Sequence, residues 1–471
     1  MDSEHSSEHW QGLLRSVFDG RRFIVCSDVA AGATGTVAAL KALGVADILV
    51  VALGRGAGPV PSPDDALVVL HEITARGNVA MIRAFKAMLE DPPASIRDAV
   101  EEYDPQRDAL VLGPFHSDVP ALLGRPFLAH RRPEWVALED KTKCDALWVR
   151  AGVPSVPSRV VTLDLLREEP EEIDVVWAGD SRDGFHGGGE GIRWIRTAES
   201  RAAAAVFFRE RCDTVRVMPF LEGVPCSIHG IVFPDFVVAL RPVEMITLRR
   251  PIDHPQSGEF VYSGCASLYD QPSDRREEMR SVARRVGERL RAEVGFRGAF
   301  TVDGVMTAVG FRPTELNPRA GAGLNALGGG LDGLPILLLL DLIVAGIDLD
   351  WQPAALEELV VAAADRVRGG GTWRGVPIAP EETTRRIAVE GVGARRTARW
   401  AAAEEPHDVV LVAGPSGGQG FARLTIVPER FESGESFAPT AVALWALLDR
   451  ELAVGTGPLL PCIPAAGARS S

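Results

Sequence analysis

The sequence predicts an α/β protein with more than one domain, and three observations lead to that prediction. The chain has 471 residues, which at roughly 150 residues per domain allows about three domains. Residues 21–114 alternate short apolar runs with helical stretches, which is typical of β-α-β units. A charged amphipathic helix at 275–296 follows further strand-like runs. We expect domains at 1–136, 137–350 and 351–471.

The first region supplies the β-α-β pattern. Residues 21–28 and 46–53 are predicted strands, residues 35–45 between them a helix, and residues 108–114 a later strand. The segment GATG at 32–35 follows a strand and precedes a helix, as a nucleotide-binding turn does. It lacks the full glycine spacing and the acidic residue about 20 positions further on, so we interpret it as a plain tight turn.

The middle region begins with a helix that ends at Gly152, after which prolines favour an extended chain. Residues 175–195 hold two strand-like ends around a glycine-rich loop. The exposed amides of such a loop suit a phosphate, and a long hairpin turn is the alternative. Two strand-like runs then flank a turn at Glu222-Gly223, and a buried helix is expected at 333–347.

The last region predicts a small α/β unit. Strand-like runs at 366–376 and 408–427 precede a helix at 438–452, and the Pro-, Gly- and Ala-rich end is expected to be loose. The segment 414–423 resembles a phosphate loop only superficially, because it lacks the Lys-Ser/Thr pair, so a lid or a turn is the expectation.

Composition and charge exclude several classes of partner. The formal net charge of −14 argues against nucleic acid, which requires a concentrated basic surface. The first ten residues are acidic and polar, unlike a secretory signal, and the apolar run 334–347 is too short to span a bilayer and contains Asp341. We therefore expect no membrane partner and a cytoplasmic protein. Six scattered cysteines predict reduced, mostly buried thiols.

The segment ELNPR, residues 315–319, concentrates polar chemistry. In an extended strand Glu315, Asn317 and Arg319 share one face, while Leu316 and Pro318 share the other. Carboxylate and amide oxygens are suitable ligands for Mg²⁺, and an Arg side chain beside them can donate two hydrogen bonds to a phosphate or carboxylate. A surface ion pair next to a turn is the alternative.

The order of these features resembles the ATP-grasp superfamily. Lys141 lies in a DK pair eleven residues before Gly152 of an AGVP segment, and Asp303 lies twelve residues before Glu315 of ELNPR. A glycine-rich hairpin and a Leu-Glu-Gly turn lie between them, and the similarity covers roughly residues 110–350. The resemblance implies an ATP-grasp fold, preceded by a pre-ATP-grasp domain that contributes to the substrate site.

The resemblance also assigns site residues. It implies ATP with Mg²⁺, or Mn²⁺ in its place, held by Asp303, Glu315 and Asn317, while Arg319 steadies an acyl phosphate or a substrate carboxylate. The residues that it assigns to ATP are Lys141, Gly184, His186, Gly187, Gly188, Gly189, Phe220, Leu221 and Glu222.

Three positions depart from the pattern of the superfamily. The second lysine of the family should fall near Trp177, where Arg182 or Arg193 would have to replace it. Met218 stands where the family has an adenine-contacting Glu, and Pro225 at the commonest ribose position.

On this resemblance the protein is an ATP-dependent carboxylate–amine ligase that acts through an acyl phosphate. Its substrates are a small-molecule carboxylate and an amine, an amino acid or a peptide, and two stretches are similar to actinobacterial natural-product peptide ligases of the pheganomycin type. A non-catalytic ATP-binding module and an enzyme with a thiol, bicarbonate or hydroxyl acceptor are the alternatives. A homodimer is the default expectation.

Four further residues have competing interpretations. The strand pattern predicts that Cys226 and His229 are core-facing or lie between strands. Arg241 and Glu244 lie where ATP-grasp proteins often contact substrate, and the sequence leaves that role open.

Overall fold

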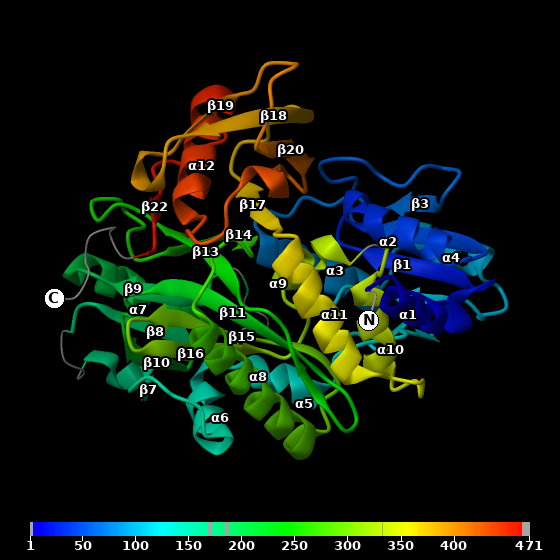
Figure 1. Cartoon of the computed structure of the whole chain (residues 1–471), viewed down its shortest axis with the longest axis horizontal. Helices are drawn as coiled ribbons and strands as arrows, with labels where there is room; N and C mark the ends of the chain where they lie inside the picture. The colour runs from blue at the N-terminus through cyan, green and yellow to red at the C-terminus, as the bar shows by residue number, and fades with distance from the viewer. Residues whose placement is uncertain are drawn as a thin grey trace.

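The computed structural model describes residues 3–167, 172–182, 184, 187, 189–331 and 333–463. Figure 1 shows a parallel sheet near the N-terminus on one side, a large central sheet, a small sheet beside it, and the C-terminal strands and helix above.

The N-terminal sheet is parallel, in the strand order β3-β2-β1-β4, so the predicted β-α-β pattern is confirmed. Its strands are β1 (Arg22–Ser27), β2 (Asp47–Ala52), β3 (Leu67–Leu70) and β4 (Leu110–Leu112). Its helices are α2 (Ala30–Ala42), α3 (Asn78–Glu90) and α4 (Ala94–Tyr103). The predicted tight turn at 32–35 is wrong, because α2 begins at Ala30 and contains both glycines of that segment. The amide of Ala30 donates to the carbonyl of Gly54 at 2.9 Å, which ties the start of α2 to the end of β2.

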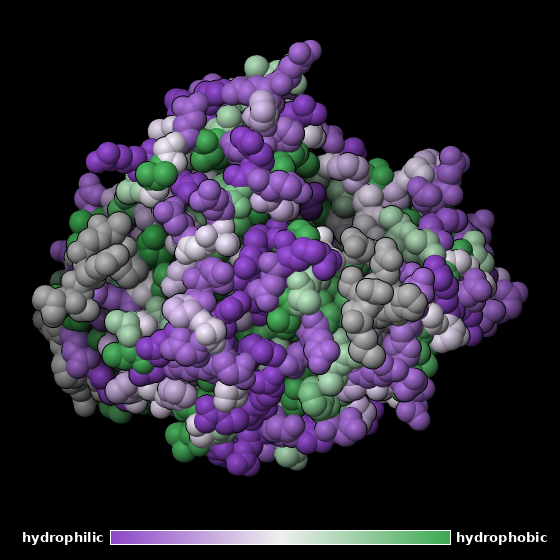
Figure 2. Space-filling model, viewed as in Figure 1, coloured by the Kyte–Doolittle hydropathy of each residue, from purple (hydrophilic) through white to green (hydrophobic). Residues whose placement is uncertain are grey.

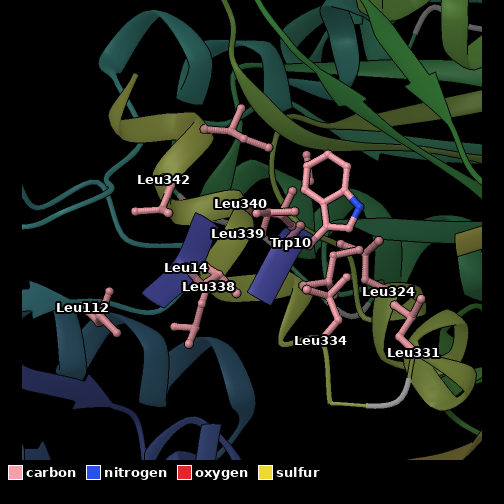
Figure 3. Close-up of a cluster of buried hydrophobic side chains, with 14 of the residues drawn as sticks. Trp10, Leu14, Leu112, Leu324, Leu331, Leu334, Leu338, Leu339, Leu340 and Leu342 are labelled. Atoms are coloured by element: carbon pink, nitrogen blue, oxygen red, sulfur yellow. The ribbon is translucent and has the colours of Figure 1, made fainter. Parts of the chain in front are cut away.

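A leucine-rich core joins the N-terminal sheet to the rest of the molecule. Helix α1 (Ser3–Phe18) places Trp10 and Leu14 against α10 (Ile336–Ala345), the buried helix that the sequence predicted at 333–347 (Figure 3). Helices α9 (Gly323–Leu327) and α11 (Pro353–Arg366) add to the same cluster. The two regions therefore share one core.

The small sheet is antiparallel, in the order β7-β10-β8-β9, and it contains the hairpin predicted at 175–195. Its strands are β7 (Arg159–Thr162), β8 (Val175–Gly179), β9 (Ile192–Ile195) and β10 (Thr214–Pro219), and α7 (Ala198–Arg211) covers one face. Short elements link it to the N-terminal sheet: β5 (Ala121–Leu122), β6 (Arg125–Pro126), α5 (Pro133–Val136) and α6 (Cys144–Ala151).

The large sheet has twelve strands in the part of the chain that the structure describes. Its main path runs β16-β15-β11-β13-β14-β17-β21-β20-β18-β19, with β12 on β11 and β22 on β13. The strands of the first half are β11 (Val224–Val232), β12 (Val237–Ala239), β13 (Val243–Arg249), β14 (Phe260–Ala266), β15 (Gly298–Thr307) and β16 (Gly310–Asn317). Those of the second half are β17 (Gly370–Val376), β18 (Thr383–Glu390), β19 (Thr397–Trp400), β20 (Val409–Ser416), β21 (Gln419–Ile426) and β22 (Leu460–Pro461).

Two helices cover this sheet. The amphipathic helix predicted at 275–296 is α8 (Ser273–Val294), whose apolar stripe packs on β11, β15 and β16. Helix α12 (Ala438–Leu452) covers the C-terminal half. The segment 414–423 is a hairpin turn, in which Gly417 and Gly418 take φ values of 58° and 82° that favour glycine.

The chain after α12 is packed as far as Cys462, contrary to the expectation of a loose end. Strand β22 pairs with β13, and the side chains of Val454 and Cys462 are buried. Residues 464–471 lie outside the described part. All six cysteines are buried and free, as predicted.

Hydrophilic residues cover most of the face drawn in Figure 2, where hydrophobic residues form small separate groups. Within the described ranges, no helix combines the length and the apolar character needed to cross a bilayer.

Candidate active site

Two rows of polar side chains cross β11, β15 and β16 at one end of the large sheet. The antiparallel register places Ser227 beside Asp303, and Asp303 beside Glu315. Two residues further along each strand, the same register aligns His229, Thr301 and Asn317. Because side chains alternate between faces, these rows point away from α8, while Cys226, Ile228, Val302 and Leu316 pack against it. The predicted metal ligands therefore share one face.

Asp303 is the most constrained of these residues. It accepts hydrogen bonds from the hydroxyl of Ser227 and, at 2.8 Å, from Nδ2 of Asn317. Burial, and then the negative charge of Glu315, raise the pKa of Asp303 to about 7. A cation would relieve that repulsion, so two carboxylates and an amide oxygen fit Mg²⁺.

A protein-only metal cage is not formed here. In the described ranges no three His, Cys, Asp or Glu side chains are grouped as a metal site. Asn317 and substrate phosphates would have to complete the ligand set around Asp303 and Glu315, as is usual for Mg²⁺.

Lys141 reaches the same row from another element. Asp140 caps a short 3₁₀ turn by accepting from the amide of Thr142 at 3.0 Å, and this turn leads into α6. Nζ of the buried Lys141 then lies 2.9 Å from Oε1 of Glu315. Burial alone would lower the pKa of Lys141, but the charge and hydrogen bond of Glu315 raise it above its usual value. Lys141 is thus a protonated ammonium beside a predicted metal ligand.

Arg319 is oriented by a carboxylate that the sequence did not reveal. Its Nε donates to Oε1 of Glu139 at 2.7 Å, and its Nη2 donates to Oδ1 of Asn317 at 2.9 Å. Arg131 also pairs with Glu139, at 2.8 Å. Burial acts to raise the pKa of Glu139, but the charges of Arg319 and Arg131 lower it on balance. The guanidinium of Arg319 therefore has a fixed direction.

A cavity of about 380 Å³ lies between the two sheets. Its large-sheet wall includes both polar rows and Arg319. Its small-sheet wall is apolar and consists of Val176, Ile192, Met218, Pro219, Phe220 and Leu221. An enclosed apolar site with a few convergent polar groups is the usual form of a small-molecule site.

The small-sheet wall carries an aromatic stack. The rings of Phe220 and Trp194 lie parallel, with centroids 3.9 Å apart. The amide of Phe220 donates to the carbonyl of Asp174 at 2.7 Å, so that amide is already engaged. Leu221 lines the cavity, and Glu222 is exposed in the following turn and outside the lining.

Near Trp177, where the second lysine of the family was expected, successive side chains of β8 point to opposite faces of the small sheet. Val175 and Trp177 pack under α7, whereas Val176 lines the cavity. Arg193 lies beside Trp177 across β8 and β9, with its guanidinium 3.8 Å from the ring centre of Phe207 in α7, so it faces away from the cavity.

Arg182, the other proposed substitute, is exposed and pairs with Asp213 at 2.7 Å. It lines a neighbouring cavity of about 730 Å³ together with Lys141 and Gly184. Neither arginine thus projects from the cavity face of β8.

Three described glycines of the glycine-rich segment line cavities. Gly187 and Gly189 line the cavity between the sheets, and Gly184 lines its neighbour. His186 and Gly188, also assigned to ATP, lie outside the described residues.

The sequence did not decide whether Arg241 and Glu244 contact substrate. In the structure both side chains bind other parts of the protein and do not line the cavity. Arg241 is buried and pairs with Asp270 at 2.7 Å and Asp365 at 2.8 Å. Glu244 accepts from the amide of Phe437 at 2.7 Å and so fixes the start of α12. A role for Arg241 or Glu244 in contacting substrate is therefore wrong.

On β13, the residues on the opposite face from Glu244 point into the cavity. Met245 and Thr247 line the cavity, and Tyr262, Cys265 and Trp373 continue the wall on β14 and β17. His229, predicted to be core-facing, also lines the cavity, whereas Cys226 does face the core.

A second cavity of about 810 Å³ lies where the N-terminal sheet meets Arg319 and α10. It lies at the carboxyl ends of β1 and β4, the point where the strand order reverses and where open α/β sheets bind ligands. Asp28 and His116 pair there at 3.3 Å, and Arg319 lines both this cavity and the first.

Comparisons with known proteins identify the fold. No protein-family model and no curated protein matches this sequence. Among solved structures, a variant of Rhizobium etli pyruvate carboxylase matches 87% of this chain with a TM-score of 0.53 at 16% identity, and the match covers 36% of that longer protein. This likeness gives the chain the ATP-grasp fold that the sequence resemblance predicted.

Two smaller ligases match over most of their length. Phosphoribosylamine–glycine ligase from Thermotoga maritima has a TM-score of 0.46 at 15% identity, over 86% of this chain and 91% of that one. L-amino acid ligase from Bacillus licheniformis has a TM-score of 0.47 at 11% identity, over 87% of this chain and 94% of that one.

Proposed function

We propose that this protein is an ATP-dependent carboxylate–amine ligase that forms an amide or peptide bond through an acyl phosphate. The observation that carries the proposal is the pair formed by Asp303 and Glu315, with Arg319 in the same cavity and Lys141 paired to Glu315 from the neighbouring cavity. Two carboxylates, an ammonium and a guanidinium so arranged suit phosphoryl transfer, where charge neutralisation and positioning supply most of the catalysis.

The residues of the chain have distinct roles in this reaction. A carboxylate oxygen of the acyl donor attacks the γ-phosphorus of ATP, ADP leaves, and an acyl phosphate forms. Lys141 offsets charge on the transferred phosphoryl group, and Arg319, held by Glu139, orients the donor carboxylate. Asp303, Glu315 and Asn317 would hold Mg²⁺, which offsets phosphate charge when bound.

The second step forms the C–N bond. The amine nitrogen attacks the acyl carbon, phosphate leaves with the bonding electrons, and the proton released by the amine passes to the departing phosphate. We assign the amine to the second cavity, because Arg319 lines both cavities and the N-terminal sheet opens there at its reversal point. Gly187 and Gly189 would close over the phosphates and exclude water.

The finer assignments follow the sequence resemblance. The substrates are amino acids or peptides, and the reaction belongs to a cytoplasmic natural-product pathway of the pheganomycin type. The base of ATP would lie against Met218, Phe220 and Leu221, with the ribose near Glu222.

One observation favours a second candidate function. The cavity side of β8 carries Val176 where a nucleotide-contacting lysine would be useful, and a non-catalytic ATP-binding module would tolerate that loss. The polar rows argue against it, because two carboxylates side by side repel each other, and the charge of Glu315 helps to raise the pKa of Asp303.

The test is ADP release by the purified protein with Mg²⁺ and ATP, across amino acids and short peptides, with hydroxylamine as surrogate amine. We expect donor-dependent ADP together with a hydroxamate. ADP without hydroxamate would indicate a thiol, bicarbonate or hydroxyl acceptor. ATP binding by calorimetry without ADP from any donor would favour the non-catalytic module.

A further inference from the structure

The charges in the cavity between the sheets are confined to one end. Among the described residues that line it, the carboxylates and guanidinium groups belong to Asp303, Glu315 and Arg319. The wall on β13, β14 and β17 has none: it consists of Met245, Thr247, Phe260, Tyr262, Cys265 and Trp373. A substrate group that lies on this wall meets thioether, hydroxyl, thiol and aromatic atoms.

This wall is continuous and adjoins the polar row. The strand register places Cys265 beside Met245 and Tyr262 beside Thr247. The rings of Tyr262 and Trp373 meet edge to face, with centroids 6.4 Å apart and planes at 83°. Burial, followed by the charges of Asp303 and Glu244, raises the pKa of Cys265 to about 12, so its thiol stays neutral close to Asp303.

Two buried polar side chains at the border of this wall have no partner. Both imidazole nitrogens of His229 and the hydroxyl of Thr301 are buried without a hydrogen bond, and the side chains are 1% and 3% exposed. They lie next to each other in the cavity, since a Cβ on Gly321 would come within 2.8 Å of His229 and 2.4 Å of Thr301. Unpaired buried polar groups of this kind are costly unless a ligand satisfies them.

The absence of a Cβ at Gly321 and Gly323 keeps this corner open. A Cβ on Gly323 would come within 2.3 Å of the His229 ring. The two glycines lie two and four residues after Arg319, and both line the cavity.

We propose that the acyl donor carries a neutral aromatic or branched apolar side chain, which lies on the wall of Met245, Tyr262 and Trp373, while His229 and Thr301 hydrogen-bond an uncharged polar group of the same donor. This inference rests on the proposed ligase function and gives its donor a chemical class. The donor carboxylate then points toward Arg319 and Asp303.

The first experiment compares donors of similar size. ADP release is measured at fixed ATP and hydroxylamine with phenylalanine, leucine, glutamate and lysine, each free and as the C-terminal residue of a dipeptide. We expect kcat/KM for the apolar donors to exceed that for the charged ones by at least about tenfold, since desolvating a charge on this wall is unfavourable. A preference for glutamate or lysine would overturn the inference and leave the ligase function intact.

Binding separates the two claims further. Calorimetry with a non-hydrolysable ATP analogue measures the affinity of each donor without turnover. Tight binding of phenylalanine or leucine donors without ADP release in the first experiment would support the apolar site and overturn the ligase function. Equal or weaker binding of these donors than of the charged ones would overturn the apolar site.

Variants test the named residues. Trp373→Ala should raise KM for aromatic donors about ten- to a hundredfold with a smaller change in kcat, and Trp373→Phe should restore most of the loss. Trp400→Ala, in β19 and outside the lining, is the matched control.

The polar pair has its own test. His229→Gln and Thr301→Val should each raise KM for the donor and leave the dissociation constant of ATP within about twofold. Melting temperatures confirm that each variant is folded. Unchanged KM values in folded Trp373→Ala and His229→Gln proteins would overturn the proposal.

Discussion

The two walls of the central cavity differ in chemistry. The large-sheet wall carries Asp303, Glu315 and Asn317 in register, with Lys141 paired to Glu315 at 2.9 Å. The small-sheet wall is apolar and stacks Phe220 on Trp194. The charged groups are thus concentrated on one wall, and the other offers apolar and aromatic side chains for dispersion and stacking. This division explains how the small sheet can lack a lysine while the polar rows stay intact.

The largest effect should come from the polar wall. Glu315→Gln keeps the shape of the side chain but removes the charge opposite Lys141 and one proposed metal ligand. We expect ADP release to fall on the order of a hundred- to a thousandfold, with ATP binding still measurable by calorimetry.

The matched control is Glu293→Gln, in α8 and paired with Arg150 at 2.9 Å away from the cavity. It should change ADP release less than about twofold. Equal losses in the two variants would mean that the charge of Glu315 has no special role.

The next test concerns the two faces of β8. Trp177 is 1% exposed in the core under α7, so Trp177→Lys should destabilise the small sheet by several kcal/mol or prevent folding, because it buries an unpaired charge. Val176→Lys points the same ammonium into the cavity. That protein should fold and bind ATP more tightly, measured by thermal melting and calorimetry.

The opposite pattern would reverse the assignment of faces. If Trp177→Lys folded and bound ATP more tightly while Val176→Lys failed to fold, then Trp177, and not Val176, would face the nucleotide.

The sequence predicted correctly which residues share a face where the alternation of side chains along one strand was enough to tell. The spacing of Glu315 and Asn317 put both on one face, and the antiparallel register then aligned Asp303 with Glu315. It failed where the choice of face needed information from a partner. Glu244 and Trp177 each stand one residue from the cavity-lining Met245 and Val176, and a shift of one residue exchanges the faces of a strand.

Other parts of the site depend on contacts between distant segments. Glu139 and Arg319 are 180 residues apart in the chain and meet only because the 3₁₀ turn Ala137–Glu139 packs against β16. The irregular pairing between Met245 and Thr247 also cannot be anticipated from hydropathy. Such contacts follow from tertiary packing, which a single sequence does not specify locally.

His229 allows a smaller effect to be measured through pH. Burial without a partner lowers its pKa to about 4 from an ordinary 6.5, so the folded state binds fewer protons than the unfolded state between these values. Above pH 6.5 the imidazole is neutral in both states, so the free energy of unfolding carries no cost from His229. As the pH falls from 6.5 toward 4, the unfolded state takes up a proton that the folded state does not, and the free energy of unfolding falls by up to roughly 3 kcal/mol. In melting experiments from pH 7 to pH 4.5, the wild-type protein should lose more stability than His229→Gln. Parallel losses would show that His229 gains a partner in solution.

The smallest effect should come from Arg193. The sequence resemblance offered this arginine as a replacement for the second lysine of the family. Its guanidinium lies over the ring of Phe207 in α7 and 3.6 Å from Glu259, so it contributes to packing on the side of the small sheet that faces away from the cavity. Arg193→Gln should lower the melting temperature by a few degrees, through about 1 kcal/mol of lost cation–π and ion-pair energy, and leave ADP release within about twofold. A large loss of turnover in a folded Arg193→Gln protein would mean that β9 turns its other face to the nucleotide, and the two walls would then both be charged.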